Sequence, residues 1–257
     1  MTNAVEVAIV ASAFGADAVR TAGHRKWAEA SRRAGAAGFE VRRELFGYEA
    51  DAAPTRLAGL GKDIAQLGLW SVYSTPASLY TADGQLDAAG LRRALDEAAA
   101  LGARFVKLQL GGFADHANGD AIAGQLKGAN VRLVVENGQL TQGGSLHQFV
   151  GLFDALTRDG HADLLGMTFD VGNWAWCGVR ALDAAVALAP YVEYVHCKIA
   201  AGEGARRFAT APAADDARFA AVLERLPRGV PRGIEFPLDA AAIHDDATRR
   251  VAWLAAA

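Results

Sequence analysis

Short runs of apolar residues recur along the chain at a nearly regular interval. Eight such runs are rich in Val, Ile, Leu and Phe, and they start 27–40 residues apart. Runs of this length and composition are typical of buried β-strands. We therefore predict strands at Val5–Val10, Phe39–Glu44, Leu69–Ser74, Arg104–Leu110, Val131–Glu136, Leu165–Asp170, Glu193–Lys198 and Gly233–Phe236.

Ala-rich segments with helical spacing separate these runs. Three of them, beginning at His24, Thr55 and Asp87, end in glycine, which commonly terminates a helix. Alternating strands and helices over this length predict a (β/α)8 TIM barrel, an α/β fold, with residues 1–257 as one domain. A doubly wound sheet is the main alternative. However, the first strand-to-helix turn lacks the G-x-G-x-x-G fingerprint of a dinucleotide fold.

Polar residues alternate with apolar ones inside several predicted strands. Because successive side chains of a strand point to opposite faces, one set in each strand faces the barrel interior. The inward sets are Glu40, Arg42 and Glu44, then Lys107 and Gln109, and then Tyr194, His196 and Lys198. Buried charges are costly unless they are paired or bound to a metal. The pattern therefore predicts a polar network inside the barrel.

Four polar residues stand at the ends of the last four predicted strands. They are Glu136, Asp170, His196 and Glu235, and the carboxyl ends of barrel strands meet at one mouth, where this fold places its active sites. Each residue alone has a structural explanation: a turn cap for Asp170, an arginine partner for Glu235 and a structural role for His196. Together they favour one divalent ion, Mn²⁺, Mg²⁺, Co²⁺ or Zn²⁺.

Weaker signals mark further residues near this mouth. Lys198 could hold a substrate oxygen or phosphate, or form an ion pair with Glu235 or Asp170. Glu44 could orient a substrate hydroxyl, or pair with Arg42 or Lys107. Lys107 could reach the mouth, although an interior salt bridge is the favoured interpretation. Trp174 could form an apolar wall against a sugar ring, or pack on a helix or at a subunit contact.

Charge and cysteine content narrow the class of partner. Lys and Arg total 26 against 29 Asp and Glu, a net charge of −3, which favours neither nucleic acid nor an anionic membrane surface. Cys177 and Cys197 form no C-x-x-C pair, which fits a reducing compartment. We find no signal peptide and no apolar stretch of about 18 residues. A cytoplasmic protein with a small-molecule substrate is expected.

Several motifs resemble those of the xylose-isomerase-like barrel superfamily, which includes sugar phosphate isomerases and epimerases. They are FEVRREL, VVENG with GGSL downstream, TFDVGN, YVHCK and GIEF. The resemblance implies that Glu136, Asp170, His196 and Glu235 bind one divalent ion. It also implies that Glu136 and Glu235 exchange the substrate proton. The implied activity is isomerisation or epimerisation of a small sugar, sugar phosphate or related polyhydroxy ketone.

Two departures from the resemblance bear on the substrate. Asn173 stands where many relatives carry a histidine, and Ile199 follows Lys198 where many carry an aspartate. An asparagine can hydrogen-bond to a substrate hydroxyl but cannot shuttle a proton, so Asn173 is a substrate-binding candidate. A lyase that dehydrates a cyclic hydroxy ketone, such as an inosose or 3-dehydroshikimate, is the main alternative.

Two other functions fit the sequence less well. Apurinic endonucleases share the barrel, but they use three metals and several strand-end histidines, whereas only His196 is so placed here. A non-catalytic sugar-binding or partner protein is opposed by the complete set of four ligands. The residues leave open whether the chain forms a homo-oligomer, as relatives often do.

Overall fold

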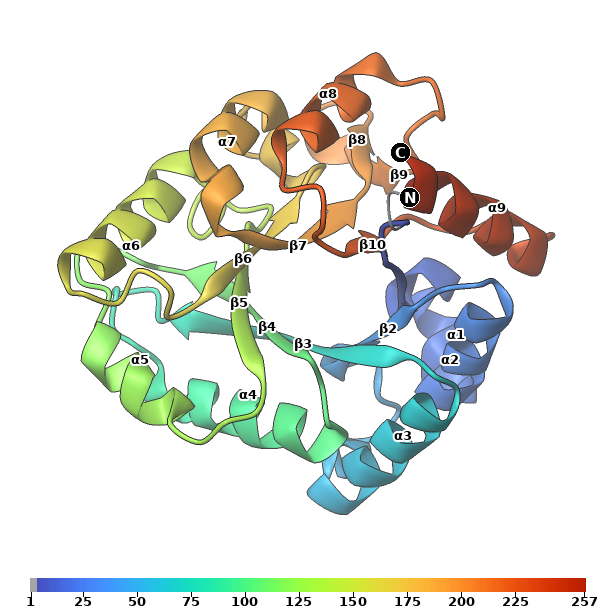
Figure 1. Ribbon diagram of the computed structural model, residues 1–257, viewed down its shortest axis with the longest axis horizontal. Helices are drawn as coiled ribbons and strands as arrows, with labels where there is room; N and C mark the ends of the chain where they lie inside the picture. Colours follow the sequence, from blue (N-terminus) through green and yellow to red (C-terminus); the bar gives the residue numbers. More distant parts are fainter. Residues whose placement is uncertain (1–3) are drawn as a thin grey trace.

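Eight parallel strands close into a barrel in the order β1-β10-β7-β6-β5-β4-β3-β2, with helices around the outside (Figure 1). The structure is a computed structural model that describes residues 4–257. The predicted (β/α)8 barrel is confirmed. The barrel strands are β1 (Val7–Val10), β2 (Gly38–Arg42), β3 (Trp70–Tyr80), β4 (Phe105–Gly111), β5 (Arg132–Glu136), β6 (Gly166–Asp170), β7 (Val192–Cys197) and β10 (Arg232–Ile234).

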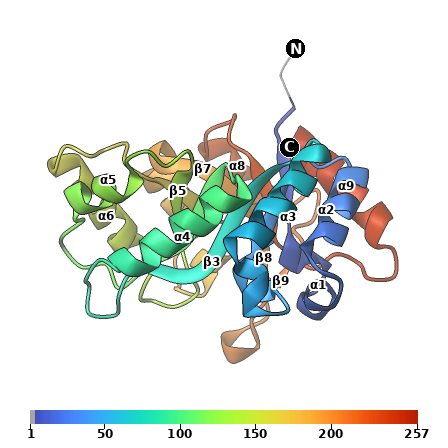
Figure 2. The same cartoon turned by 90° about the horizontal axis from the view of Figure 1, so that it is seen from below.

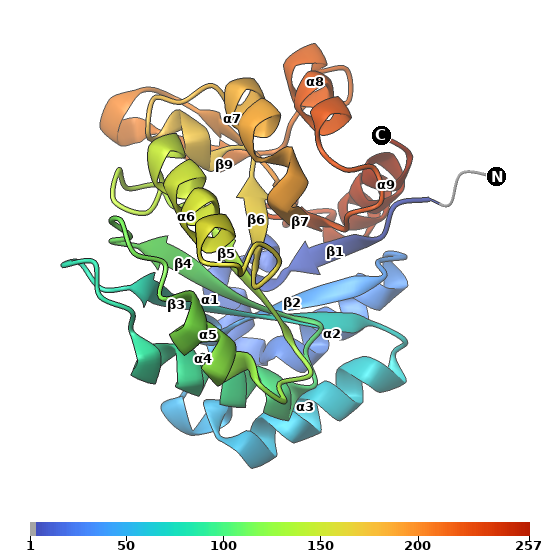
Figure 3. The same cartoon turned by 60° about the vertical axis from the view of Figure 1, so that its left-hand side comes forward.

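A helical layer covers the outer surface of the barrel, as Figures 1 and 3 show from two sides. Two helices connect β1 to β2, and one helix follows each of the other barrel strands along the chain. The helices are α1 (Ala16–Ala22), α2 (His24–Arg33), α3 (Pro54–Gln66), α4 (Ala88–Leu101), α5 (Gly119–Leu126), α6 (Leu146–Arg158), α7 (Ala181–Leu188), α8 (Ala217–Arg225) and α9 (Ile243–Ala256).

Helix α4 shows how the sequence sets these elements. The Asp87 carboxylate caps the helix by accepting the Gly90 N–H at 2.8 Å. Gly102 ends it in the left-handed region at φ 69°. Its buried residues recur at helical spacing, from Leu91 to Leu101. A side chain at Gly61 of α3 would lie 1.9 Å from the Leu101 carbonyl oxygen, so glycine permits this close helix packing.

The predicted strands are present, but one is longer than expected and one pair was not predicted. β3 extends to Tyr80 instead of ending at Ser74, with an irregular register between Ser74 and Ser78. An antiparallel hairpin, β8 (Ile199–Ala201) with β9 (Phe208–Thr210), follows β7. Figure 2 shows this hairpin projecting from one end of the barrel, with the C terminus at the other end. Its strands are too short and Ala-rich to give a strand signal.

Two layers fill the barrel interior. The lower layer is apolar and consists of Ala8, Val72, Phe105, Val134 and Tyr194, with Trp70 packed against it. The Phe105 and Tyr194 rings stack with centroids 6.1 Å apart. Two residues further along β4 and β7, the same inward face carries Lys107 and His196, which begin a charged upper layer. The predicted polar interior is therefore confined to the carboxyl ends of the strands.

None of the helices in residues 4–257 is long and apolar enough to cross a membrane.

Candidate metal centre

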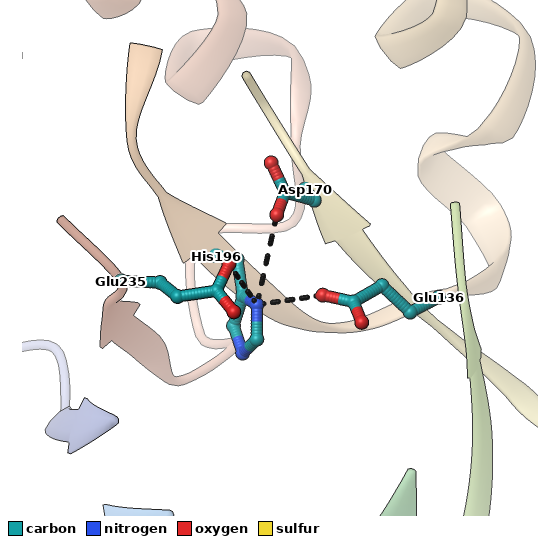
Figure 4. Close-up of side chains that lie close together, drawn as sticks. All are labelled: Glu136, Asp170, His196 and Glu235. Carbon is teal, nitrogen blue, oxygen red and sulfur yellow. Dashed lines mark hydrogen bonds and ion pairs between the residues drawn. The ribbon is translucent and has the colours of Figure 1, made fainter. Parts of the chain in front are cut away.

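Four neighbouring strand ends bring the four predicted ligands together. Glu136 ends β5 and Asp170 ends β6, His196 is the penultimate residue of β7, and Glu235 directly follows β10. Strand register aligns them, because Asp170 pairs with His196 across β6 and β7. One donor atom from each residue lies within 4.8 Å of the others. Figure 4 shows three carboxylates converging on one imidazole nitrogen.

That nitrogen is Nδ1 of His196. It lies 2.7 Å from Glu136 Oε1, 3.0 Å from Glu235 Oε2 and 3.7 Å from Asp170 Oδ2. The side chains of His196 and Asp170 are fully buried, and those of Glu136 and Glu235 are 4% and 9% exposed. Neutral imidazole and carboxylate oxygens at such separations can surround one divalent ion.

The other imidazole nitrogen is held from below by Glu40. Nε2 of His196 lies 2.8 Å from Glu40 Oε2, and both side chains are fully buried. A carboxylate here accepts a hydrogen bond from a protonated Nε2, which leaves the Nδ1 lone pair free to face an ion. A side chain at Gly233 would lie 2.3 Å from the Tyr194 hydroxyl and 3.1 Å from the His196 ring. Glycine on β10 therefore makes room for the imidazole.

Lys107 and Gln109 fix the carboxylate of Glu136. Nζ of Lys107 lies 2.5 Å from Glu136 Oε2 and 3.4 Å from Glu40 Oε1, and Nε2 of Gln109 donates to Glu136 Oε2 at 2.8 Å. These contacts occupy Oε2 and direct Oε1 toward His196. The favoured interpretation of Lys107 as an interior salt bridge is confirmed. Its side chain is 1% exposed, so it lies beneath the ligands and not at the open mouth.

Asp170 uses its two carboxylate oxygens differently. Oδ1 accepts the backbone N–H groups of Gly172 and Asn173, each at 2.9 Å, and so caps the following turn. The Asn137 side chain brackets the Asp170 backbone by accepting its N–H at 2.8 Å and donating to its carbonyl at 3.0 Å. The turn cap and the ligand role are thus compatible, because Oδ2 still faces the cluster.

Lys198 and Arg42 close the cluster on the side of Glu235. Nζ of Lys198 lies 2.7 Å from Asp170 Oδ2 and 2.6 Å from Glu235 Oε2. The Arg42 guanidinium donates to Glu235 Oε1 at 2.6 Å and to Glu44 Oε1 at 2.7 Å. Glu44 lies in a turn just after β2 and pairs with Arg42, as its structural interpretation expected. Substrate binding by Lys198 and Glu44 stays a prediction.

The structure corrects one predicted substrate contact and restricts another. Trp174 is fully buried and packs against Phe149 and Phe169 in the layer between β6 and α6, so its ring does not face the mouth. Asn173 is 5% exposed, and its amide already donates to the Asn137 carbonyl and accepts from Gln139. A substrate hydroxyl would have to share or replace these hydrogen bonds.

Buried carboxylate oxygens and an unbalanced charge both fit a cation site. Glu136 Oε1 and Asp170 Oδ2 are buried and make no hydrogen bond within residues 4–257, and their close contacts are the ion pairs with His196 and Lys198. The network contains five carboxylates and three basic side chains, an excess of two negative charges if His196 is neutral. A single divalent ion would neutralise it. The members are Glu40, Glu44, Glu136, Asp170 and Glu235, with Arg42, Lys107 and Lys198.

The pKa shifts express the same excess of negative charge. Burial lowers the pKa of His196, but Glu235 and Glu40 outweigh it and raise this pKa well above its usual value. Burial raises the pKa of Glu136, but Lys107 and His196 outweigh it and hold this pKa below its usual value. The carboxylates thus hold a positive charge between them, which is a proton on His196 or a metal ion.

Sequence reasoning missed several supporting residues. Glu40, Arg42 and Gln109 carried a signal, because strand alternation directs all three inward, but apart from the pairing of Arg42 with Glu44 their partners were not predicted. Asn137 carried no signal beyond its position after Glu136. Its role depends on how β5 and β6 align in space.

Comparison with known proteins supports the fold. The chain matches no known family description and no curated protein. Among solved structures, D-allulose 3-epimerase from Methylomonas sp. in complex with D-allulose superposes with a TM-score of 0.67 at 15% identity, covering 98% of this chain and 96% of that one. A xylose isomerase domain containing protein from Salmonella typhimurium LT2 gives 0.66 at 15%, covering 97% of each chain.

A third similar structure carries a different activity in its name. The probable 3-DHS dehydratase from Bacillus anthracis, involved in petrobactin synthesis, superposes with a TM-score of 0.64 at 12% identity, covering 97% of this chain and 98% of that one. At these identities the likeness extends to the fold. The chain therefore has the barrel fold that these epimerase, xylose-isomerase-like and dehydratase structures share, as its motifs predicted.

Proposed function

We propose that this protein is a divalent-metal-dependent isomerase or epimerase of a small sugar, sugar phosphate or related polyhydroxy ketone. The observation that carries the proposal is the convergence of Glu136, Asp170, His196 and Glu235 within 4.8 Å at the mouth of the barrel. Solved structures with this fold include an epimerase in complex with D-allulose. The ligand set fits Mn²⁺, Mg²⁺, Co²⁺ or Zn²⁺.

The two glutamates are the proposed proton carriers. When bound, the ion would polarise a substrate carbonyl and so acidify the neighbouring C–H bond. Figure 4 shows Glu136 and Glu235 approaching Nδ1 of His196 from opposite sides. A substrate carbon placed between them meets a carboxylate on each face. One carboxylate removes the proton and keeps it, and the other carboxyl group, which carries a proton from solvent, delivers that proton to the opposite face, which inverts the carbon.

Supporting residues prepare each carboxylate for this task. Lys107 and Gln109 hold Oε2 of Glu136, so Oε1 is directed toward the ligand cluster. Arg42 and Lys198 hold the two oxygens of Glu235. These charge-assisted hydrogen bonds fix both carboxylates before the substrate arrives, which lowers the reorganisation that proton transfer requires.

Isotope exchange tests the proposal directly. The protein is incubated in D₂O with Mn²⁺ or Co²⁺ and a panel of ketoses and ketose phosphates, and each sugar is analysed by NMR and mass spectrometry. We expect deuterium next to the carbonyl of at least one substrate, together with its epimer or isomer. The absence of exchange across the whole panel, from a protein shown to bind the metal, would contradict the proposal.

A lyase is the second candidate function, because one of the structures with this fold is named as a probable dehydratase. A dehydratase begins with the same proton abstraction and then expels water from the next carbon. Incubation with a cyclic hydroxy ketone would then produce a conjugated enone, which absorbs in the ultraviolet. Growth of this absorbance without epimer formation would replace the epimerase assignment with the lyase.

A further inference from the structure

Apart from the ligand cluster at the barrel mouth, the molecule has a cavity outside the barrel wall, near the carboxyl end of β2. It has a volume of about 540 Å³ and is lined by residues of α1, α2, the β2–α3 connection and α3. Figure 1 shows these three helices in succession along the outside of the barrel. None of the four metal-ligand residues lines this cavity. Its volume is within the range of small-molecule sites.

A buried histidine of the cavity wall has a hydrogen-bond donor without a partner among the described residues. His24, the first residue of α2, is 3% exposed and lines the cavity. Its Nε2 accepts the backbone N–H of Arg42 at 3.3 Å, so the proton of the neutral ring is on Nδ1. Burial lowers the pKa of His24 to about 4, which keeps the ring neutral. Nδ1 is buried and has no partner among the described residues.

Two helices begin at the same cavity without a side-chain cap. Gly23 precedes α2 and Ala53 precedes α3, and neither residue provides a capping side chain. The first turns of both helices contribute to the cavity wall, through Arg25 of α2 and through Thr55 of α3. Pro54 leaves the first residue of α3 without an N–H, and the Arg56 N–H already donates to the Ala53 carbonyl at 2.9 Å. The amino end of α2, with the Thr55 N–H and the dipole of α3, therefore favours an anion at this position.

The charged side chains of the wall sharpen the choice of ligand. Three arginines and two aspartates line the cavity. Arg25 lies 3.4 Å from Asp63, whereas Arg56 has no salt bridge within the described part of the chain. Asp51 accepts the Tyr48 N–H at 3.2 Å and is the carboxylate that opposes an anion. Arg56 and Asp51 are therefore the two residues whose charges should act on a bound anion in opposite directions.

We propose that this cavity binds an oxyanion of phosphate or sulfate size, carried by a small metabolite, on Nδ1–H of His24, the amino ends of α2 and α3, and Arg56. The bare anion does not fill the cavity, so a phosphorylated or sulfated small molecule is the expected class. The remaining wall includes Leu45, Phe46 and Leu60, which can pack against the apolar part of such a molecule. This site is separate from the proposed metal centre.

Sulfate is a suitable probe, because its charge does not titrate near neutral pH. The 257-residue protein with Mg²⁺ present is titrated with sodium sulfate, against sodium chloride at equal ionic strength, by calorimetry and by ¹⁵N-resolved NMR of the histidine rings. We expect saturable binding of one sulfate and a shift of the His24 Nδ1–H signal. Arg56→Gln should weaken binding about tenfold, because one charge-assisted hydrogen bond is lost. Asp51→Asn should tighten it severalfold.

Arg158→Gln is the matched control, since it removes the same charge from the exposed last turn of α6. It should leave sulfate affinity unchanged, and thermal melting should show that all three variants are folded. The proposal is overturned if binding is not saturable, if the control loses as much affinity as Arg56→Gln, or if the His24 signal does not move. None of these results affects the metal-centre proposal, because no ligand residue lies in the cavity.

Discussion

The two layers of the barrel interior are built from the same strands but differ in what they leave unsatisfied. In the lower layer, apolar side chains pack against each other, and Phe105 contacts both Tyr194 and Trp70. In the upper layer, two residues along, the charges pair but leave a negative excess around His196. The lower layer packs without charged groups, although the Tyr194 hydroxyl has no hydrogen-bond partner within residues 4–257, and the upper layer carries a negative excess that a cation would balance.

Residues that stabilise the barrel and residues of the proposed site therefore lie only two positions apart along β4 and β7. Burial of apolar surface in the lower layer stabilises the barrel whatever is bound at the mouth. The upper layer instead places buried carboxylates around one point, an arrangement that is expensive without an ion. Each prediction below acts on one layer and tests whether the other is unaffected, and the predictions run from the largest expected effect to the smallest.

Glu136→Gln should remove the chemistry while leaving the barrel folded. The substitution deletes one proposed metal ligand and proposed proton carrier, so the deuterium-exchange rate should fall at least about 10³-fold. Glu224→Gln, on an exposed position of α8, is the control and should exchange at the native rate. If Glu136→Gln retained a tenth of the native rate, Glu136 would not be a proton carrier.

Phe105→Ala tests the lower layer. Truncating this ring removes its contacts with Tyr194 and Trp70 and leaves a cavity. We expect the free energy of unfolding to fall by about 3–5 kcal/mol, measured by urea denaturation. Metal affinity, measured on the folded fraction at low temperature, should stay near the native value. A large loss of metal affinity would show that the two layers are mechanically coupled.

Metal removal tests the upper layer without a substitution. An ion that binds the folded chain at 100 times its Kd adds about 2.7 kcal/mol to the free energy of unfolding. Thermal melting with Mn²⁺ and with excess chelator should show this difference for the native protein. The difference should persist in Phe105→Ala and vanish in Glu136→Gln. Equal stabilisation of all three proteins would place the ion outside the upper layer.

The sequence predicts the strands and their ends better than the contacts within the upper layer, for a physical reason. Periodic apolar runs locate the strands, because each strand must bury its own residues, and the strand ends then place Glu136, Asp170, His196 and Glu235 at one mouth. Partner choice in the upper layer depends on register between strands. The contact of Glu40 with His196 joins residues 156 positions apart, and no local pattern encodes it.

Trp174 is a second residue whose surroundings the local sequence could not predict. Its place after Asp170 suggested a ring at the mouth, but an aromatic side chain in a loop can turn either way. The apolar surface of Phe149 and Phe169 is what draws the ring into the layer behind β6. Burial of this kind is decided by neighbours from α6 and β6 together, so loop position alone could not reveal it.

Glu40→Gln should produce the smallest effect, because Glu40 touches a proposed ligand and not the ion. The carboxylate accepts a hydrogen bond from the Nε2–H of His196 and keeps Nδ1 directed at the other ligands. An amide can instead donate to Nε2, which favours the tautomer with its proton on Nδ1. Mn²⁺ affinity, measured by calorimetry, should therefore fall about 10–100-fold.

Glu97→Gln is the control for a partly buried, paired carboxylate. Glu97 accepts the Tyr73 hydroxyl at 2.7 Å and pairs with Arg43, in the outer layer and without contact to His196. It should lose stability but keep its metal affinity. Hyperfine coupling between Mn²⁺ and ¹⁵N-labelled imidazole reports the coordinating nitrogen directly. If Glu40→Gln kept both this coupling and the native affinity, the four proposed ligands alone would determine metal binding. The contact of Glu40 with His196 would then serve only to stabilise the fold.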